Sequence, residues 1–181
     1  AGFKQIGRKV MDDVEDGVKY AISQGWVNEN KIGIYGGSHG GYATLMGLVK
    51  TPDLYACGVN YVGVSNIETL FKSIPEYWKP QLKIMGEIWY DLDNPEELKI
   101  AREVSAVNNV DKIKKPLLVV QGANDPRVNI NESDQIVTAL RTKGFDVPYM
   151  VKYNEGHGFQ REENRMDFYS AMLGFFAKHL K

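Results

Sequence analysis

Serine, aspartate and histidine are the residue types that together perform nucleophilic catalysis, and this chain carries one of each in a suggestive setting. Ser38 lies inside the glycine-rich run 36–41, which follows the apolar run 32–35. A Gly-x-Ser-x-Gly pattern between a short strand and an amphipathic helix is typical of a nucleophile elbow, a sharp turn that presents the serine hydroxyl. Asp125 and His157 each come directly after a predicted strand.

The glycines of this turn have a steric reason. A nucleophile elbow holds its serine in a strained backbone conformation, so the residues two places before and after it must be small. We therefore predict that valine at Gly36 or Gly40 destroys the turn. Phosphate binding is disfavoured, because the run continues into Tyr42 where a phosphate loop needs lysine, and the G-x-G-x-x-G spacing is missing. An ordinary tight turn with a solvated serine stays open as an alternative.

A serine hydroxyl is a poor nucleophile at neutral pH until a base removes its proton. His157 is the candidate base, and Asp125 is the candidate carboxylate that fixes the imidazole tautomer and stabilises the imidazolium. The order Ser, Asp, His along the chain is that of the α/β-hydrolase fold. His39 is expected to contribute its backbone N–H to an oxyanion hole, with its side chain secondary, and His179 is placed on a solvated helix end.

Length and composition restrict the class of protein. A chain of 181 residues with a net charge of −1 predicts one domain, and the absence of a basic block interleaved with aromatic residues argues against a nucleic-acid partner. The single cysteine, Cys57, lies in an apolar run and is interpreted as a small buried hydrophobe. Its lack of a partner for a disulfide is compatible with a cytoplasmic location, which we take as the expectation.

Metal and membrane functions have little support in the sequence. Three histidines without H-E-x-x-H spacing and without a cysteine pair predict neither a metal site nor another cofactor. No apolar stretch approaches the roughly 20 residues that span a bilayer, so no membrane partner is expected. The chain opens with Ala1 rather than methionine, and we expect it to be a piece of a longer polypeptide.

Apolar periodicity predicts the elements that position the reactive residues. Strands are expected at 31–35, 56–64, 117–120 and 147–153, and helices at 7–24, from the elbow to about 50, at 132–143 and at 164–178. In the first helix Val10, Val14, Val18 and Ile22 recur every four positions. Strands that alternate with helices predict a parallel sheet with helices on both faces. The carboxyl ends of its strands would then bring Ser38, Asp125 and His157 to one edge.

Residues 66–102 interrupt this alternation. They contain Trp78, Trp89 and three further aromatic residues among prolines and charges, without one clear period. We interpret them as a helical insert over the edge of the sheet. Its aromatic side chains either line a specificity pocket or anchor the insert to the core, and the sequence alone leaves both open.

Three stretches in order, residues 36–42, 122–128 and 155–159, resemble the prolyl oligopeptidase family of serine peptidases. The likeness runs over essentially the whole chain and is greatest to the acylaminoacyl-peptidase and dipeptidyl-peptidase branches. It implies an α/β-hydrolase domain that cleaves amide bonds of short peptides through an acyl-enzyme. By this resemblance Ser38 is the nucleophile, Asp125 orients the base, His157 is the general base, and the backbone N–H of His39 is half of the oxyanion hole.

The resemblance also implies a substrate site. Arg127, two places after the aspartate, matches the family's arginine that binds a backbone carbonyl of the substrate; a surface arginine that ties down a loop is the alternative. Val64 and Val128 match positions that line the pocket for the residue before the scissile bond, and Trp78 or Trp89 is expected to contribute.

Family members carry a propeller, further strands and a second oxyanion donor before the segment seen here. These parts are not among residues 1–181, so we expect a lower turnover for this chain alone, because a missing oxyanion donor typically costs about 10²–10³ in turnover. The predicted strand 31–35 would become an open edge, and we expect another copy of the chain or a complementing fragment to cover it. A carboxylesterase acting on small acyl esters and a noncatalytic assembly subunit are the alternative functions.

Overall fold

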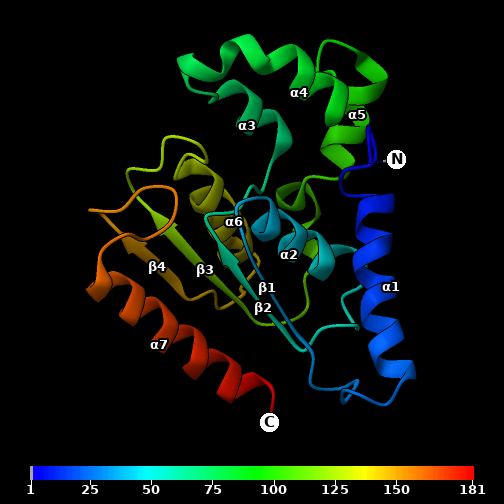
Figure 1. Ribbon diagram of the computed structural model, residues 1–181, viewed down its shortest axis with the longest axis vertical. Helices are drawn as coiled ribbons and strands as arrows, with labels where there is room; N and C mark the ends of the chain where they lie inside the picture. The colour runs from blue at the N-terminus through cyan, green and yellow to red at the C-terminus, as the bar shows by residue number, and fades with distance from the viewer. Residues whose placement is uncertain (1) are drawn as a thin grey trace.

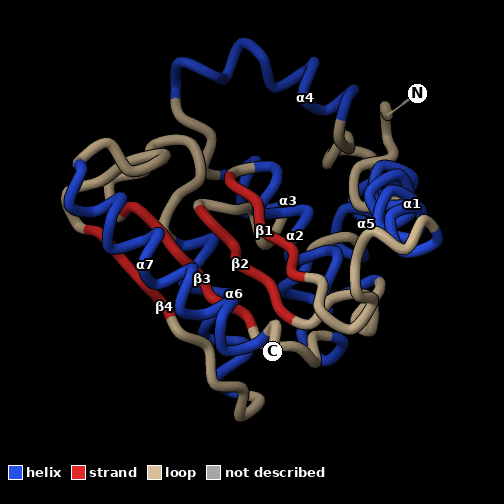
Figure 2. The backbone as a smooth tube through the Cα atoms, turned by 60° about the horizontal axis from the view of Figure 1, so that its bottom comes forward, coloured by secondary structure: helices blue, strands red, loops and turns tan. Residues whose placement is uncertain are grey.

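The computed structural model describes residues 2–181 and places four parallel strands in one sheet (Figure 1). The strands follow one another across the sheet in chain order: β1 (Gly33–Gly37), β2 (Cys57–Tyr61), β3 (Leu117–Gly122) and β4 (Tyr149–Lys152). Figure 2 shows them side by side, with β1 and β4 at the two edges. Because all four run in the same direction, the loops after β1, β3 and β4 leave from the same edge of the sheet.

Helices cover both faces of the sheet, as predicted. They are α1 (Lys9–Ser23), α2 (His39–Lys50), α3 (Ile67–Lys72), α4 (Leu82–Ile88), α5 (Pro95–Glu103), α6 (Asn131–Thr142) and α7 (Glu162–His179), with 3₁₀ turns at η1 (Glu76–Gln81) and η2 (Ala106–Lys112). Helices α2 and α6 pack on one face, while α7 packs on the other against β2 and β3 (Figure 1).

The side chains of β3 alternate between two hydrophobic cores, as the pleat of a strand requires. Leu117 and Val119 join the core under α2 and α6, and Leu118 and Val120 join the core under α7. The α7 core is completed by Cys57, Val59, Phe159, Phe168 and Phe175. The central sheet is therefore covered on both sides, which keeps the loops at its carboxyl edge in fixed positions.

The ends of all four strands differ from the predicted ones; β3 runs to Gly122 rather than residue 120, and β4 covers 149–152 rather than 147–153. Strand β1 begins at Gly33 because the N–H of Lys31 is used in a turn, donating to the carbonyl of Asn28 at 2.9 Å. Strand β2 stops at Tyr61 rather than near residue 64, because Val62 adopts a φ of +44° and turns the chain out of the sheet.

Helix α1 buries the face that its valines predicted only in part. Val10 and Val18 pack against the core, but Val14 is 38% exposed. The buried residues of this helix are Met11 and Glu15. Glu15 makes a polar contact across the helix pair, since Lys50 of α2 donates to it at 2.8 Å. This bond holds the buried Glu15 on the inner face of α1, and the valines at the border of that face are half-buried or exposed.

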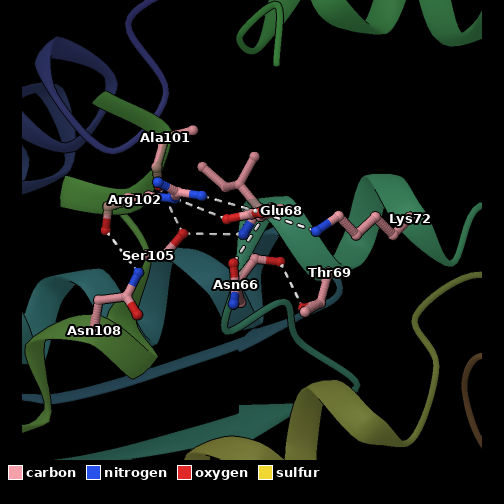
Figure 3. Close-up of polar contacts among 9 residues, drawn as sticks. Asn66, Glu68, Thr69, Lys72, Ala101, Arg102, Ser105 and Asn108 are labelled. Atoms are coloured by element: carbon pink, nitrogen blue, oxygen red, sulfur yellow. Dashed lines mark hydrogen bonds and ion pairs between the residues drawn. The ribbon is translucent and has the colours of Figure 1, made fainter. Parts of the chain in front are cut away.

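The segment between β2 and β3 is helical and stands over the carboxyl edge of the sheet (Figure 1). Glu68 joins α3 to α5 (Figure 3). Its carboxylate accepts a bond from Arg102 Nε of α5 at 2.9 Å and another from Lys72 Nζ of α3 at 2.9 Å. These bonds from Arg102 and Lys72 lower the pKa of Glu68 to about 2. The pair of Arg102 with Glu68 thus ties α5 to α3, whereas the pair of Lys72 with Glu68 lies within α3.

We predict that Glu68→Gln lowers the free energy of unfolding at pH 7 by only about 1 kcal/mol, because both cations are largely exposed and screened by solvent. The lowered pKa gives stability that is present above the ordinary value near 4.5 and is lost as the pH falls toward 2. Urea unfolding at pH 7 and at pH 2.5 should therefore show a difference between the two proteins that shrinks with acid. A difference that is independent of pH would contradict this account.

Among residues 2–181, none of the helices combines the length and apolarity needed to cross a bilayer.

Candidate active site

Ser38 lies at the sharp turn between β1 and α2 and has the strained backbone of a nucleophile elbow. Its φ is +58°, a region that residues other than glycine rarely adopt, and its N–H donates to the carbonyl of Tyr61 at 2.9 Å. A Cβ at Gly36 would lie 2.3 Å from the backbone of Gly40, which explains the first glycine of the pattern. A Cβ at Gly40 would meet nothing within 4 Å, so the structure shows no steric need for glycine at the level of one carbon there, and the effect of the larger valine stays a prediction.

The three predicted reactive side chains meet in one hydrogen-bonded line. His157 Nε2 lies 2.9 Å from Ser38 Oγ, and His157 Nδ1 lies 2.7 Å from Asp125 Oδ2. The Asp125 side chain is fully buried, and that of His157 is 15% exposed. Since these residues follow β1, β3 and β4, the parallel sheet accounts for a meeting between residues far apart in sequence.

The loop after β3 holds the Asp125 carboxylate by its backbone. Oδ1 accepts the N–H groups of Arg127 and Val128, both at 2.9 Å. The buried Gln121 side chain supports the same loop, donating to the carbonyl of Val128 at 3.1 Å and accepting from Ser133 Oγ at 2.9 Å. One carboxylate oxygen is therefore saturated by the backbone, and the other faces the imidazole, where it can fix the tautomer.

The loop that carries His157 is anchored by the buried carboxylate of Glu155. This carboxylate accepts the N–H groups of Gln160 at 2.8 Å and Arg161 at 2.9 Å, and the amide of Asn164 at 2.7 Å. Burial alone would raise the pKa of Glu155, but these hydrogen bonds outweigh it and lower that pKa. The ionised carboxylate thus closes the loop against the start of α7.

A pocket of about 280 Å³ opens beside Ser38. All five residues that the sequence assigned to substrate binding line it: Val64, Trp78, Trp89, Arg127 and Val128. The guanidinium of Arg127 lies 6.0 Å from the centre of the Trp78 ring, within the range of a cation–π contact. The sequence missed Leu70, Gln81 and Met85, which also line the pocket, because the helical segment that supplies them has no clear period.

His39 is the first residue of α2, so its N–H has no acceptor within the helix and lies at the positive end of the helix dipole. Its ring also lines the pocket and meets the Trp89 ring edge-on, with centres 5.5 Å apart. Partial desolvation lowers the pKa of His39, which favours the neutral imidazole. The side chain of His39 is therefore a wall of the pocket as well as a neighbour of Ser38.

Cys57 and His179 have no predicted role in the site; the prediction for Cys57 is confirmed and that for His179 is corrected. Burial raises the pKa of the Cys57 thiol to about 11, in keeping with a buried hydrophobe. His179 is half-buried against Phe175, with ring centres 4.6 Å apart, rather than fully solvated. Within residues 2–181, His, Cys, Asp and Glu side chains form no group of three that could hold a metal ion.

Comparisons with known proteins place the chain in a family. Residues 1–181 match the model of the prolyl oligopeptidase family. The chain is 44% identical over 180 residues to dipeptidyl aminopeptidase BIII of Pseudoxanthomonas mexicana, covering 99% of this chain and 26% of that protein. It is 40% identical over 171 residues to dipeptidyl peptidase family member 6 of Caenorhabditis elegans, covering 92% of this chain and 23% of that protein. The chain belongs to the prolyl oligopeptidase family and spans about a quarter of the length of these relatives.

A solved structure gives the fold. A puromycin-hydrolysing peptidase of Mycobacterium tuberculosis superposes with a TM-score of 0.89 at 23% identity, covering 99% of this chain and 26% of that one. The fold is thus that of the α/β-hydrolase domain of these peptidases, as the sequence predicted.

Proposed function

We propose that this chain carries the reactive centre of a serine peptidase that hydrolyses amide bonds of short peptides through an acyl-enzyme. The observation that carries the proposal is the line from Ser38 Oγ through the His157 ring to Asp125, with contacts of 2.9 and 2.7 Å. Membership of a peptidase family supports the reaction class.

In the proposed reaction Ser38 Oγ attacks the substrate carbonyl carbon while its proton passes to His157 Nε2. Asp125, facing Nδ1, stabilises the imidazolium, and the N–H of His39 donates to the oxyanion. The imidazolium then gives its proton to the leaving amine as the C–N bond breaks, which leaves an ester on Ser38. A water molecule then attacks that ester while its proton passes to His157. The imidazolium returns this proton to Ser38 Oγ as the C–O bond breaks, which releases the acid and restores the hydroxyl.

The pocket beside Ser38 supports a preference for an apolar residue before the cut bond. Its walls are largely aliphatic and aromatic, with Val64, Trp89 and Val128 among them. Arg127 is the cationic side chain among the residues that line it. We propose that Arg127 binds a backbone carbonyl of the substrate, since a guanidinium donates in a fixed planar fork.

Replacement of Arg127 by alanine is predicted to raise KM for a peptide substrate by about 10-fold or more and to change kcat by less than about 3-fold. The reason is that the lost hydrogen bond would stabilise the substrate complex and the transition state equally. Steady-state kinetics with a peptide anilide would measure both constants. The matched variant Arg127→Lys keeps the charge without the fork and should fall between the two. An unchanged KM with a lower free energy of unfolding would instead favour the loop-tethering role.

The proposed function is tested by labelling the folded chain with a fluorophosphonate and locating the adduct by mass spectrometry. Labelling at Ser38 is expected. Peptide anilides and short acyl esters with the same apolar acyl group then separate a peptidase from the alternative carboxylesterase, for which ester cleavage alone would be found. A folded chain that no serine-directed reagent labels would favour the noncatalytic assembly role.

The outer side of β1 offers a place for an assembly contact, because within the described part of the chain this edge pairs with no strand. Tyr35 on β1 is 46% exposed, and Tyr169 and Leu173 on α7 are exposed as well. We propose that a second copy covers this edge in the isolated chain. Light scattering is expected to show a dimer whose fraction rises with concentration, and a compact monomer at high concentration would contradict the proposal.

A further inference from the structure

Tyr61 contacts both the nucleophile and the loop of the proposed base. It is the last residue of β2 and pairs in register with Gly37 of β1. Its carbonyl accepts the N–H of Ser38 at 2.9 Å, and its hydroxyl accepts the N–H of Phe159, two residues beyond His157. One residue therefore fixes Ser38 through its backbone and the His157 loop through its side chain.

The ring of Tyr61 is held by two other aromatic rings. It stacks on Phe168 of α7 with ring centres 4.5 Å apart and planes 28° from parallel. It also meets Phe159 edge-on, with centres 5.2 Å apart. Burial raises the pKa of Tyr61 to about 12, although the bond from the Phe159 N–H opposes this, so the phenol stays neutral at physiological pH. A ring packed in this way presents its hydroxyl at a fixed place.

The loop itself needs such a fixed point. His157 lies between Gly156 and Gly158, and Gly158 has a φ of +96° that other residues rarely adopt. On the amino-terminal side the loop is held by the carbonyl of Glu155, which accepts the N–H of Asn124 at 2.9 Å. On the carboxyl-terminal side Gly158 forms an isolated antiparallel bridge with Gly156, within the loop itself, and the bond from Phe159 to Tyr61 is the one that ties this side of the loop to the sheet.

We propose that Tyr61 is a positioning residue that keeps the His157 ring within reach of the Ser38 hydroxyl. The inference rests on the proposed function, because only a base must hold its place during proton transfer. A displacement of about 1 Å in a reacting group can cost about 10²-fold in rate. The hydroxyl of Tyr61, rather than its ring, carries this role, because the hydroxyl is the group that binds the loop.

The first test is the kinetics of Tyr61→Phe, which keeps the ring and removes the hydroxyl. We expect kcat and the rate of fluorophosphonate labelling at Ser38 to fall by about 10- to 100-fold, with KM within about 2-fold of wild type. The matched control is Tyr149→Phe, in which the lost hydroxyl donates to Asp134 Oδ1 at 2.8 Å rather than contacting the His157 loop. This variant should keep the wild-type rate.

The second test does not depend on activity. The His157 Nδ1 proton, which faces Asp125 at 2.7 Å, should give a downfield proton signal that broadens or is lost in Tyr61→Phe, while the Phe159 amide exchanges faster with solvent. If the wild-type chain is not labelled, the proposed function fails and this signal still decides the role of Tyr61. An unchanged His157 signal in Tyr61→Phe, with or without a change in stability, overturns the inference.

Discussion

Replacement of His157 by alanine is expected to slow labelling of Ser38 by a fluorophosphonate by about 10⁴-fold or more, because the hydroxyl then has no base at 2.9 Å to take its proton. The chain should stay folded with a free energy of unfolding lower by about 1–3 kcal/mol, because the side chain is only 15% exposed and its removal leaves the buried Asp125 Oδ2 without its imidazole partner. Intact-mass measurement of the adduct against time gives the rate, and urea unfolding gives the stability.

A second histidine provides the control for this variant. His179→Ala removes a half-buried imidazole that packs on Phe175, in the region of α7 remote in sequence from the reactive loop. Its labelling rate should equal that of wild type even if its stability falls. Reactivity of His157→Ala equal to that of wild type would remove His157 as the base.

Replacement of Gly36 by alanine is expected to lower the free energy of unfolding by at least about 3 kcal/mol, at the upper end of the cost of overpacking. The new Cβ would lie 2.3 Å from the carbonyl carbon and oxygen of Gly40, which are backbone atoms that no rotamer change can move. Ser38 cannot shift easily either, because its N–H is bound to Tyr61. Urea unfolding would measure the loss, with the slope of the free energy of unfolding against urea concentration expected to be the same in both proteins.

Gly40→Ala is the matched variant for the same turn. Its Cβ meets nothing within 4 Å, and Gly40 lies in α2, where alanine is favoured over glycine by about 0.8–1 kcal/mol. We expect a neutral or slightly stabilising effect with Ser38 still labelled. Equal destabilisation by the two substitutions would show that strain at Ser38, rather than the contact between Gly36 and Gly40, decides which residues the turn accepts.

The meeting of Ser38, His157 and Asp125 could be predicted from the sequence, because two simple rules are sufficient. The glycine pattern marks the turn at Ser38, and the parallel sheet brings the residues that follow β3 and β4 to the same edge. Helix α6 was also predictable, since Ile136 and Leu140 repeat at helical spacing and are fully buried.

Features that depend on partners elsewhere in the fold could not be predicted. The bond from Lys50 holds Glu15 on the buried face of α1, which no periodicity of valines reveals. The pocket wall at Met85 comes from a segment without a repeating apolar pattern. Tyr61 looks like an ordinary strand residue until its partner, Phe159, is brought beside it from 98 residues away in the sequence.

The most direct test of the central claim, that Ser38, His157 and Asp125 act as one unit, is the labelling rate of the His157→Ala/Asp125→Asn double variant against each single variant. Residues that act as a unit give losses far from additive, because the carboxylate has no role once the imidazole is gone. We predict that Asp125→Asn alone slows labelling by about 10⁴-fold and that the double variant is no slower than His157→Ala alone. Losses that multiply in the double variant, or an Asp125→Asn variant that reacts at the wild-type rate, would contradict the account.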